Sequence, residues 1–274
     1  MIDELTYEDE INFEPIWVPR AALRYAQAIA YPDLDIDGYL ESIQQLAERA
    51  RENIPLGAQP RVQGEALAEF LFQQLGFKGD TTNYSDPKNS YLNEVLERRL
   101  GIPITLAVIY VAVAEKLGVP AQGVGLPGHF IVRITDPDGP VYLDPFNGGV
   151  RLSVTDCAEL VQKTTGYQGN FKPEWLEPAS PLDILSRMLG NLRNAYVQRQ
   201  SWSKALAVVE LLRITQPYKA EHLRDLGLIL HQHGSLRQAI DMLEKYLLRM
   251  PEAPDADVVR RDLQIAAQKL SQRN

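Results

Sequence analysis

Cysteine is almost absent from this sequence, which holds a single one, Cys157, among 274 residues. One cysteine excludes an intrachain disulfide framework and fits a reducing compartment. Long apolar runs are missing as well, because the longest, Ile102 to Ala114, is too short for the roughly 20 residues of a membrane-spanning helix. The segment 1–17 is acidic and lacks the basic and apolar stretches of a signal peptide. We therefore expect a cytoplasmic protein without a membrane partner.

Excess positive charge is also missing. The formal net charge is −8, and the segment 180–274 carries 14 Lys+Arg against 10 Asp+Glu, which leaves a net −12 for the segment 1–179. An acidic chain repels phosphate backbones, so no nucleic-acid partner is expected. Histidine and cysteine are few as well, and we expect neither a metal nor a cofactor. No recognised ligand motif pairs the four histidines, which are His129, His222, His231 and His233.

The length predicts two domains, because one domain usually spans about 100 to 200 residues. Residues 1–17 are interpreted as an acidic tail, residues 18–179 as an α+β domain and residues 180–274 as a helical module. Within the α+β domain a helix is expected over Gly64 to Leu75, ending at Gly76. Another is expected over Pro103 to Leu117. It is apolar nearly all round, which predicts burial on most sides, and proline suits its first turn.

Residues 129–144 change from a helical to an alternating pattern and predict an antiparallel hairpin. With the six-residue loop Thr135 to Pro140, His129 and Asp144 fall on one face, opposite each other or one diagonal step apart. The other face is wholly apolar and consists of Phe130, Val132, Ile134, Val141 and Leu143. A register that buries this face turns His129 and Asp144 away from it together. A carboxylate bonded to one imidazole nitrogen leaves the second nitrogen free to act as a base.

An internal repeat marks the helical module. The same offset separates Ala205 from Ala239 and Pro217 from Pro251. It equals the length of a tetratricopeptide repeat, about 34 residues, so two repeats and a final helix over residues 256–270 are predicted. Such modules commonly bind protein segments. The alternative is a generic pair of helical hairpins, because Arg193 stands where the repeat usually has glycine.

A family resemblance rests on four segments. Gly-Ile-Pro-Ile-Thr-Leu-Ala (101–107), Leu-Gly-Val-Pro (117–120), His129 and Asp144-Pro145 resemble the transglutaminase-like core. The SirB-type bacterial branch is more similar still, through residues 71–77, Tyr84 with Asp86-Pro87, and residues 89–96, 127–130 and 144–146, and the repeat tail is typical of it. The resemblance implies a papain-like α+β fold with a small antiparallel sheet. It brings no established reaction with it.

The same resemblance places the cysteine nucleophile of the family at Pro103, which has no nucleophilic side chain. Cys157 is expected to be a small packed hydrophobic residue. Thr105, the nearest hydroxyl, is either a candidate nucleophile or a locally hydrogen-bonded side chain. Asn93 and Tyr142 are candidate ligand contacts, and Asn93 has a second interpretation as a brace for the turn before the helix.

Catalysis through a thiol is therefore not expected. Our first hypothesis is a non-catalytic transglutaminase-like protein, an adaptor that binds a protein segment or small ligand in the former active-site cleft and a partner on the repeats. The alternative is a cysteine-independent hydrolase or amidase in which Asp144 orients His129, and His129 activates water or Thr105. A third interpretation gives His129 and Asp144 a structural role only. The sequence predicts neither an oligomeric state nor a substrate.

Overall fold

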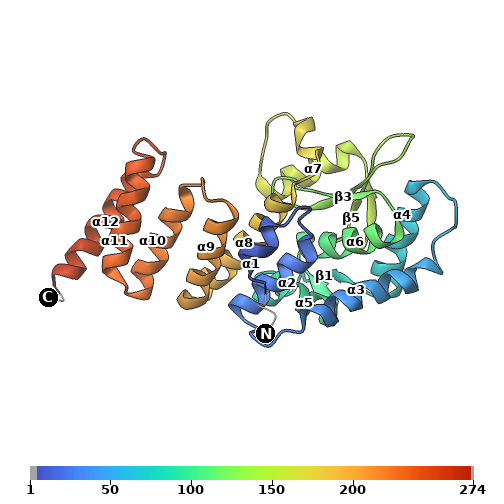
Figure 1. Cartoon of the computed structure of the whole chain (residues 1–274). Coiled ribbons are helices and arrows are strands. Elements are labelled where there is room, and N and C mark those ends of the chain that lie inside the picture. Colours follow the sequence, from blue (N-terminus) through green and yellow to red (C-terminus); the bar gives the residue numbers. More distant parts are fainter. Residues whose placement is uncertain (1–4, 273–274) are drawn as a thin grey trace. The chain divides into compact units, whose positions relative to one another are not determined.

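The computed structural model describes residues 5–272 and divides them into two compact units (Figure 1). One unit comprises residues 12–188, and the other combines residues up to 11 with those from 189 onward. The division falls inside a single helix, α8 (Pro181–Gln198).

The unit of residues 12–188 combines helices with a small sheet, as the α+β prediction required. Its α-helices are α2 (Val18–Ile29), α3 (Ile36–Arg51), α4 (Pro60–Ala68), α5 (Leu92–Arg98), α6 (Pro103–Leu117) and α7 (Val154–Thr165). Two 3₁₀ segments are η2 (Pro87–Ser90) and η3 (Pro173–Leu176). The strands are β1 (Lys78–Gly79), β2 (Leu100–Gly101), β3 (Ala121–Val124), β4 (Ile131–Ile134), β5 (Val141–Asp144) and β6 (Val150–Leu152). Strands β3 to β6 form one antiparallel sheet in sequence order, and β1 pairs with β2 in parallel.

Helix α6 is the central element of this unit, and it begins and ends as predicted. Pro103 occupies the first turn after the extended Ile102, and the left-handed Gly118 (φ 73°) caps the C-terminus. Eleven of its residues are buried, because an apolar surface on all sides must be covered on all sides. The sheet lies between α6 and α7 (Figure 1). On the side of the sheet that faces α7, buried apolar side chains that include Ile131 and Val161 form a separate cluster.

The helix expected over Gly64 to Leu75 differs from the prediction in its start and in its winding. Helix α4 already begins at Pro60, and from Glu69 to Gln74 the chain continues as a wider π-helical segment, η1. Phe70, Leu71 and Phe72 are all buried there. Successive residues of an α-helix point about 100° apart, so three consecutive core residues favour a local widening of the helix. Gly76 adopts the left-handed conformation expected of a terminating glycine.

The second unit contains α9 (Trp202–Thr215), α10 (Glu221–His233), α11 (Leu236–Arg249) and α12 (Ala256–Ser271). Ala205 on α9 and Ala239 on α11, the pair that marks the repeat in the sequence, are both fully buried, which fits small residues at helix crossings. Gly227 on α10 is equally restricted, because a methyl group there would come within 2.6 Å of Leu243. These placements explain the repeat period in terms of packing.

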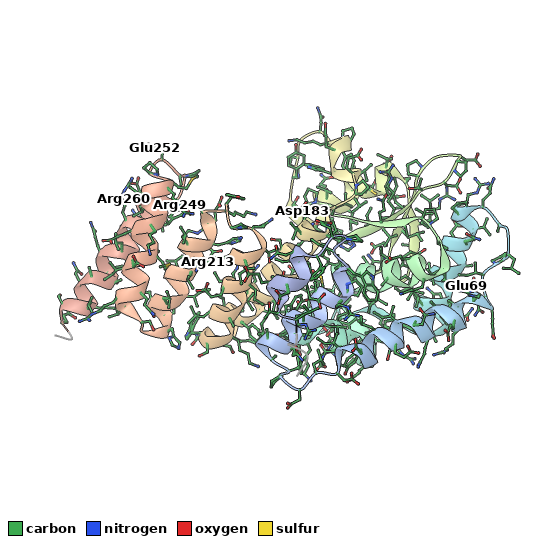
Figure 2. All side chains as sticks on the ribbon, in the orientation of Figure 1. Glu69, Asp183, Arg213, Arg249, Glu252 and Arg260 are labelled. Atoms are coloured by element: carbon green, nitrogen blue, oxygen red, sulfur yellow. The ribbon has the colours of Figure 1, made fainter. Side chains whose placement is uncertain are left out.

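Charged side chains cover the outside of the repeat helices and also link them. Figure 2 shows Arg249 and Arg260 among the exposed ones. The guanidinium of Arg193 pairs with Asp225, so the residue that replaces the usual glycine makes an ion pair between helices. Arg224 of α10 pairs with Asp255, the residue that precedes α12.

Part of the segment interpreted as an acidic tail is ordered. Residues Tyr7–Asn12 form α1, in which Tyr7 and Ile11 are buried. Their spacing of four places both on one helix face. The Tyr7 hydroxyl donates a hydrogen bond of 2.8 Å to Thr215, since Thr215 gives its own proton to the Leu211 carbonyl. An amphipathic helix was missed because the acidic residues around it dominate the composition.

A buried histidine predicts acid sensitivity of the repeat unit. His222 is 5% exposed, and neither ring nitrogen has a hydrogen-bond partner among residues 5–272. Burial lowers the pKa of His222, although Asp225 acts in the opposite direction. The folded state therefore binds fewer protons than the unfolded state, whose histidine pKa is about 6.5. Stability is fully present above that value and decreases as the pH falls below it.

We expect His222→Leu to remove part of this acid sensitivity and to raise the melting temperature at pH 5.5 by several degrees. Thermal unfolding of the full chain at pH 7.5 and pH 5.5, followed by circular dichroism, measures it. His233→Gln, a change of an exposed histidine, is the matched control. Equal loss of stability on acidification in His222→Leu and the unsubstituted chain would contradict the prediction.

Candidate functional site

The candidate site begins at the first turn of α6, where the family resemblance predicts a nucleophile and the chain has Pro103. Pro103 is buried at the first helical position, where the lack of an N–H costs nothing. Further along the same turn, the Thr105 hydroxyl accepts a hydrogen bond from the Ile102 amide (3.1 Å). Its proton points to the carbonyl of Asn89 (2.9 Å) or of Ile102 (3.1 Å). Thr105 thus fastens the turn that precedes the helix.

Thr105 is poorly placed to act as a nucleophile. The side chain is completely buried, and within residues 5–272 its hydrogen bonds go to Asn89 and Ile102, with none to His129. The turn is also tight, because a methyl group on Gly101 would lie 2.8 Å from the threonine oxygen. This geometry agrees with the locally hydrogen-bonded interpretation of Thr105.

Asn89 organises the loop in front of α6, a role that the sequence analysis missed. It is fully buried. Its amide nitrogen donates to Asp80 (3.1 Å) and to the Asn83 carbonyl (2.9 Å), while its oxygen accepts from Arg98. Asn89 lies in the segment 89–96 that carried the family resemblance. This part of the motif is a structural anchor for the start of α6.

His129 and Asp144 meet as the hairpin register predicts. Strands β4 and β5 pair Val132 with Leu143 and Ile134 with Val141, which leaves His129 one diagonal step from Asp144 on the other face. His129 Nε2 lies 3.0 Å from the Asp144 carboxylate. The bond leaves Nδ1 as the nitrogen through which His129 could act on another group.

Asp144 receives three further hydrogen bonds. The amides of Phe146 (3.0 Å) and Asn147 (3.3 Å) and the Asn147 side chain (2.7 Å) all donate to its carboxylate. Burial by itself raises the pKa of Asp144, but the bonds from His129 and Asn147 outweigh it, and the pKa is lowered. The carboxylate is therefore held in its charged form.

His129 and Asp144 form a dyad that is covered by aromatic side chains. The cover lies on the side of the hairpin opposite to its apolar face. His129 is 5% exposed and Asp144 1% exposed. The Phe146 ring stands edge-on to His129 with the ring centres 6.0 Å apart, and Tyr84 makes a similar contact with Phe146 at 5.9 Å. The sequence predicted that both polar residues turn away from the apolar face, but it did not predict this aromatic cover. The aromatic cover narrows the access of a substrate to His129, which keeps 5% of its surface exposed.

The two candidate ligand contacts lie apart from the dyad's hydrogen bonds. Tyr142 is part of the apolar cluster beneath α7 and is 7% exposed, and burial raises its pKa. Asn93 on α5 is 4% exposed, and its side-chain oxygen has no hydrogen-bond partner among the described residues. The oxygen thus braces no backbone group, which leaves the ligand interpretation of Asn93 as a prediction.

Cys157 is packed in the cluster beneath α7. It is fully buried. Burial, with smaller contributions from Asp156 and Asp144, raises the pKa of its thiol to about 11. At pH 7.5 fewer than about one thiol in a thousand is ionised at that pKa, and only the thiolate reacts with alkylating agents.

We expect iodoacetamide to label native Cys157 at pH 7.5 at least about 100-fold more slowly than the same thiol in urea, where the pKa returns to about 8.5. Mass spectrometry over time measures both rates. The native rate should keep rising with pH up to about 10. A native rate that is fast and independent of pH near neutrality would show an activated thiol instead.

Neither a metal cluster nor a membrane-spanning helix is found in residues 5–272. No three or more His, Cys, Asp or Glu side chains are grouped so that they could hold an ion. None of the described helices combines the length and the apolar character needed to cross a bilayer.

Comparison with known proteins supports the fold assignment. The sequence pattern of the transglutaminase-like superfamily matches residues 37–190, more than half of the chain. The chain belongs to this superfamily. A tetratricopeptide repeat pattern matches residues 192–264, which confirms the repeat prediction over the generic helical hairpins.

Two relatives match most of the chain, including both the transglutaminase-like region and the repeat region. A UPF0162 protein of Xylella fastidiosa (strain Temecula1) is 39% identical over 236 residues, which cover 84% of this chain and 83% of that protein. A UPF0162 protein of Vibrio cholerae is 27% identical over 253 residues, covering 91% and 92%. These relatives confirm the SirB-type resemblance. F-box only protein 21 of Mus musculus is 35% identical over 140 residues, covering 47% of this chain and 21% of that protein.

Proposed function

We propose that this transglutaminase-like protein is a non-catalytic adaptor. The observation that supports the proposal most strongly is Pro103 in the first turn of α6, because the family resemblance predicts the cysteine nucleophile at this position and proline has no nucleophilic side chain. Its neighbour Thr105 cannot readily replace a thiol, because the hydroxyl is buried and already hydrogen-bonded. The domain then keeps the paired His129 and Asp144 without a side chain at the start of α6 that could form an acyl intermediate.

The repeats provide the second half of the proposal. Tetratricopeptide repeats generally bind protein segments, and their pattern covers residues 192–264 here. A protein partner on the repeats and a protein segment or small ligand near the former active site would make the chain a bridge. Asn93, with its unpartnered oxygen, is the proposed ligand contact near α6. We also propose a cytoplasmic location.

Affinity capture from lysate tests the adaptor role. The full chain should retain at least one specific protein, and this protein should be lost when the repeat surface is changed by charge reversal at exposed positions such as Arg249. Charge reversal at exposed Glu41 on α3 is the control. If the full chain retained no specific protein at any salt concentration, the adaptor role would be wrong.

A cysteine-independent hydrolase or amidase is the second candidate, and the 3.0 Å bond between His129 and Asp144 favours it. An imidazole oriented by a carboxylate can assist attack by water, which contributes about 10²- to 10⁴-fold. Peptide, ester and isopeptide substrates should then be cleaved slowly, with loss of activity in His129→Ala. Activity that His129→Ala leaves unchanged would exclude this dyad as the site.

A further inference from the structure

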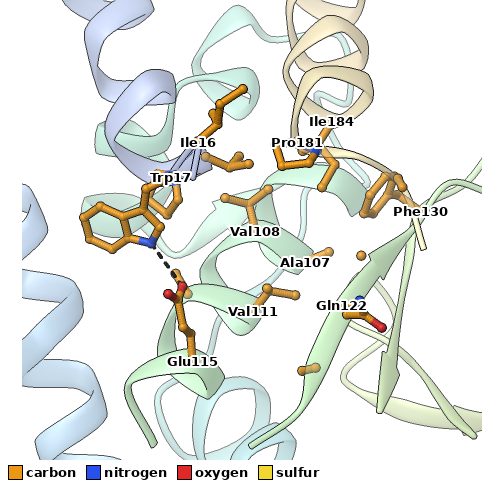
Figure 3. A pocket seen from close by; sticks show the side chains of 16 residues that line it. Ile16, Trp17, Ala107, Val108, Val111, Glu115, Gln122, Phe130, Pro181 and Ile184 are labelled. Carbon is orange, nitrogen blue, oxygen red and sulfur yellow. Dashed lines mark hydrogen bonds between the residues drawn. The ribbon is translucent and has the colours of Figure 1, made fainter. Parts of the chain in front are cut away.

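A pocket of about 250 Å³ opens beside α6, away from the dyad (Figure 3). Its walls come from the start of α2, the outer face of α6, strand β3 and the first turn of α8. Phe130 lines it, whereas the preceding His129 faces Asp144. The pocket and the dyad are therefore two separate sites of the same unit.

The lining is mainly apolar and includes Val108, Val111 and Ile184. Figure 3 shows Val111 and Val108 on the α6 side of the pocket, opposite Gln122 of β3. Sites for whole small molecules usually measure about 300 to 1,000 Å³. A smaller apolar pocket is suited to one bulky side chain, and such an anchor often dominates a peptide interface.

One carboxylate gives this pocket a charge preference. Glu115 Oε2 accepts a hydrogen bond from the Trp17 indole at 3.1 Å, which holds it at the rim (Figure 3). No ion pair joins Glu115 to a lysine, arginine or histidine in the described part of the chain. The surrounding unit is acidic, since residues 12–188 contain 22 Asp+Glu against 15 Lys+Arg. Both features attract a cationic partner, and the neighbouring Lys116 ammonium, which lies over the Trp17 ring 4.9 Å from its centre, reduces this attraction in part.

We infer that this pocket binds a peptide segment that presents one bulky apolar side chain next to a lysine or arginine. The apolar side chain fills the space between α6 and β3, and the basic side chain reaches Glu115 at the rim. The inference extends the proposed adaptor function to a binding site that involves neither the repeats nor the dyad. It gives that site a partner of defined chemistry.

Titration of the full chain with acetyl-Lys-Leu-Lys-amide tests the inference. The indole N–H signal of Trp17, assigned by its loss in Trp17→Phe, should shift saturably in ¹⁵N-resolved NMR spectra. Replacing leucine in the peptide by alanine should weaken binding by about tenfold, because alanine buries much less apolar surface in the pocket. Replacing both lysines by glutamate should abolish binding.

Two protein variants test the apolar space of the pocket and the charge of Glu115 separately. Val111→Phe fills the pocket and should abolish the shift, whereas Val154→Phe, a matched change at an exposed residue of α7, should leave it intact. Glu115→Gln keeps an acceptor for Trp17 but removes the charge. It should weaken binding about two- to fivefold, as expected for an exposed ion pair, and reduce the salt dependence.

Three outcomes would overturn the inference: no saturable shift at millimolar peptide, equal affinity for the leucine and alanine peptides, or unchanged binding by Val111→Phe. Sedimentation of the protein without peptide tests whether a second copy of the chain occupies the pocket instead. A dimer that Val111→Phe dissociates would assign the pocket to a second copy of the chain and would also overturn the inference. Affinity capture on the repeats does not depend on this pocket, so failure of either experiment can be told from failure of the other.

Discussion

Replacement of Asp144 by alanine is expected to lower the free energy of unfolding of the transglutaminase-like unit by about 3–5 kcal/mol. The substitution removes the shared acceptor of His129, of the Phe146 and Asn147 amides and of the Asn147 side chain. The buried His129, left without its acceptor, carries most of this cost, whereas the exposed Asn147 can bond to water instead. The midpoint of urea unfolding, followed by tryptophan fluorescence in a Trp202→Phe background, measures the change. Trp17 and Trp175, both in this unit, then report alone.

His129→Ala should cost less than Asp144→Ala, because Asp144 keeps its other three donors. Asp33→Ala, at an exposed position, is expected to stay within about 0.5 kcal/mol of the unsubstituted chain. Since the pKa of Asp144 is lowered on folding, its contribution is present above about pH 4 and is lost as the pH falls through the lowered pKa. An unchanged urea midpoint in Asp144→Ala would show that the dyad does not support the fold.

Gly149→Ala is expected to destabilise the same unit by about 2–5 kcal/mol, for two separate reasons. Gly149 has φ of 76°, which costs a non-glycine residue about 1–2 kcal/mol. The new methyl group would also lie 2.6 Å from the Phe72 ring and 2.9 Å from the Ala68 methyl. Ala68 is fixed to the backbone of α4 and cannot turn aside, so overpacking adds about 1–3 kcal/mol. The urea midpoint is again the measurement.

Gly76→Ala separates these two contributions. Gly76 has the same φ of 76°, but a methyl group there meets no atom within 4 Å. We expect the backbone cost alone, about 1–2 kcal/mol. Equal destabilisation by both substitutions would mean that the contact of Gly149 with α4 and η1 adds nothing.

The sequence predicted those parts of the fold that depend on local periodicity. The hairpin register follows from a six-residue loop and strict alternation, and the structure pairs Ile134 with Val141 across that loop. The repeat follows from the constant offset that relates Ala205 to Ala239, whose small side chains are needed where helices cross. The limits of α6 follow from Pro103 and Gly118, each suited to one end of a helix.

Contacts between segments far apart in the chain could not be predicted in this way. Nothing in the sequence around Asn89 indicates that its carbonyl meets Thr105, because no periodic pattern relates a position in a loop to a position in the following helix. The cover of His129 by Phe146 depends on how the chain turns after β5. The π-helical winding of η1 reflects the packing of Phe70 to Phe72 in three dimensions.

The hydrogen bonds of Asp144 also bear on how such proteins evolve. When an enzyme loses its nucleophile, a carboxylate that serves catalysis alone can be replaced by mutation without a loss of fitness. Replacement of Asp144 would also lower the stability of the fold, because its carboxylate holds the chain after β5 through hydrogen bonds from Phe146 and Asn147. Selection for folding alone can therefore preserve a histidine and aspartate pair long after turnover has ceased. A histidine and aspartate pair of this kind is therefore not by itself evidence of catalysis.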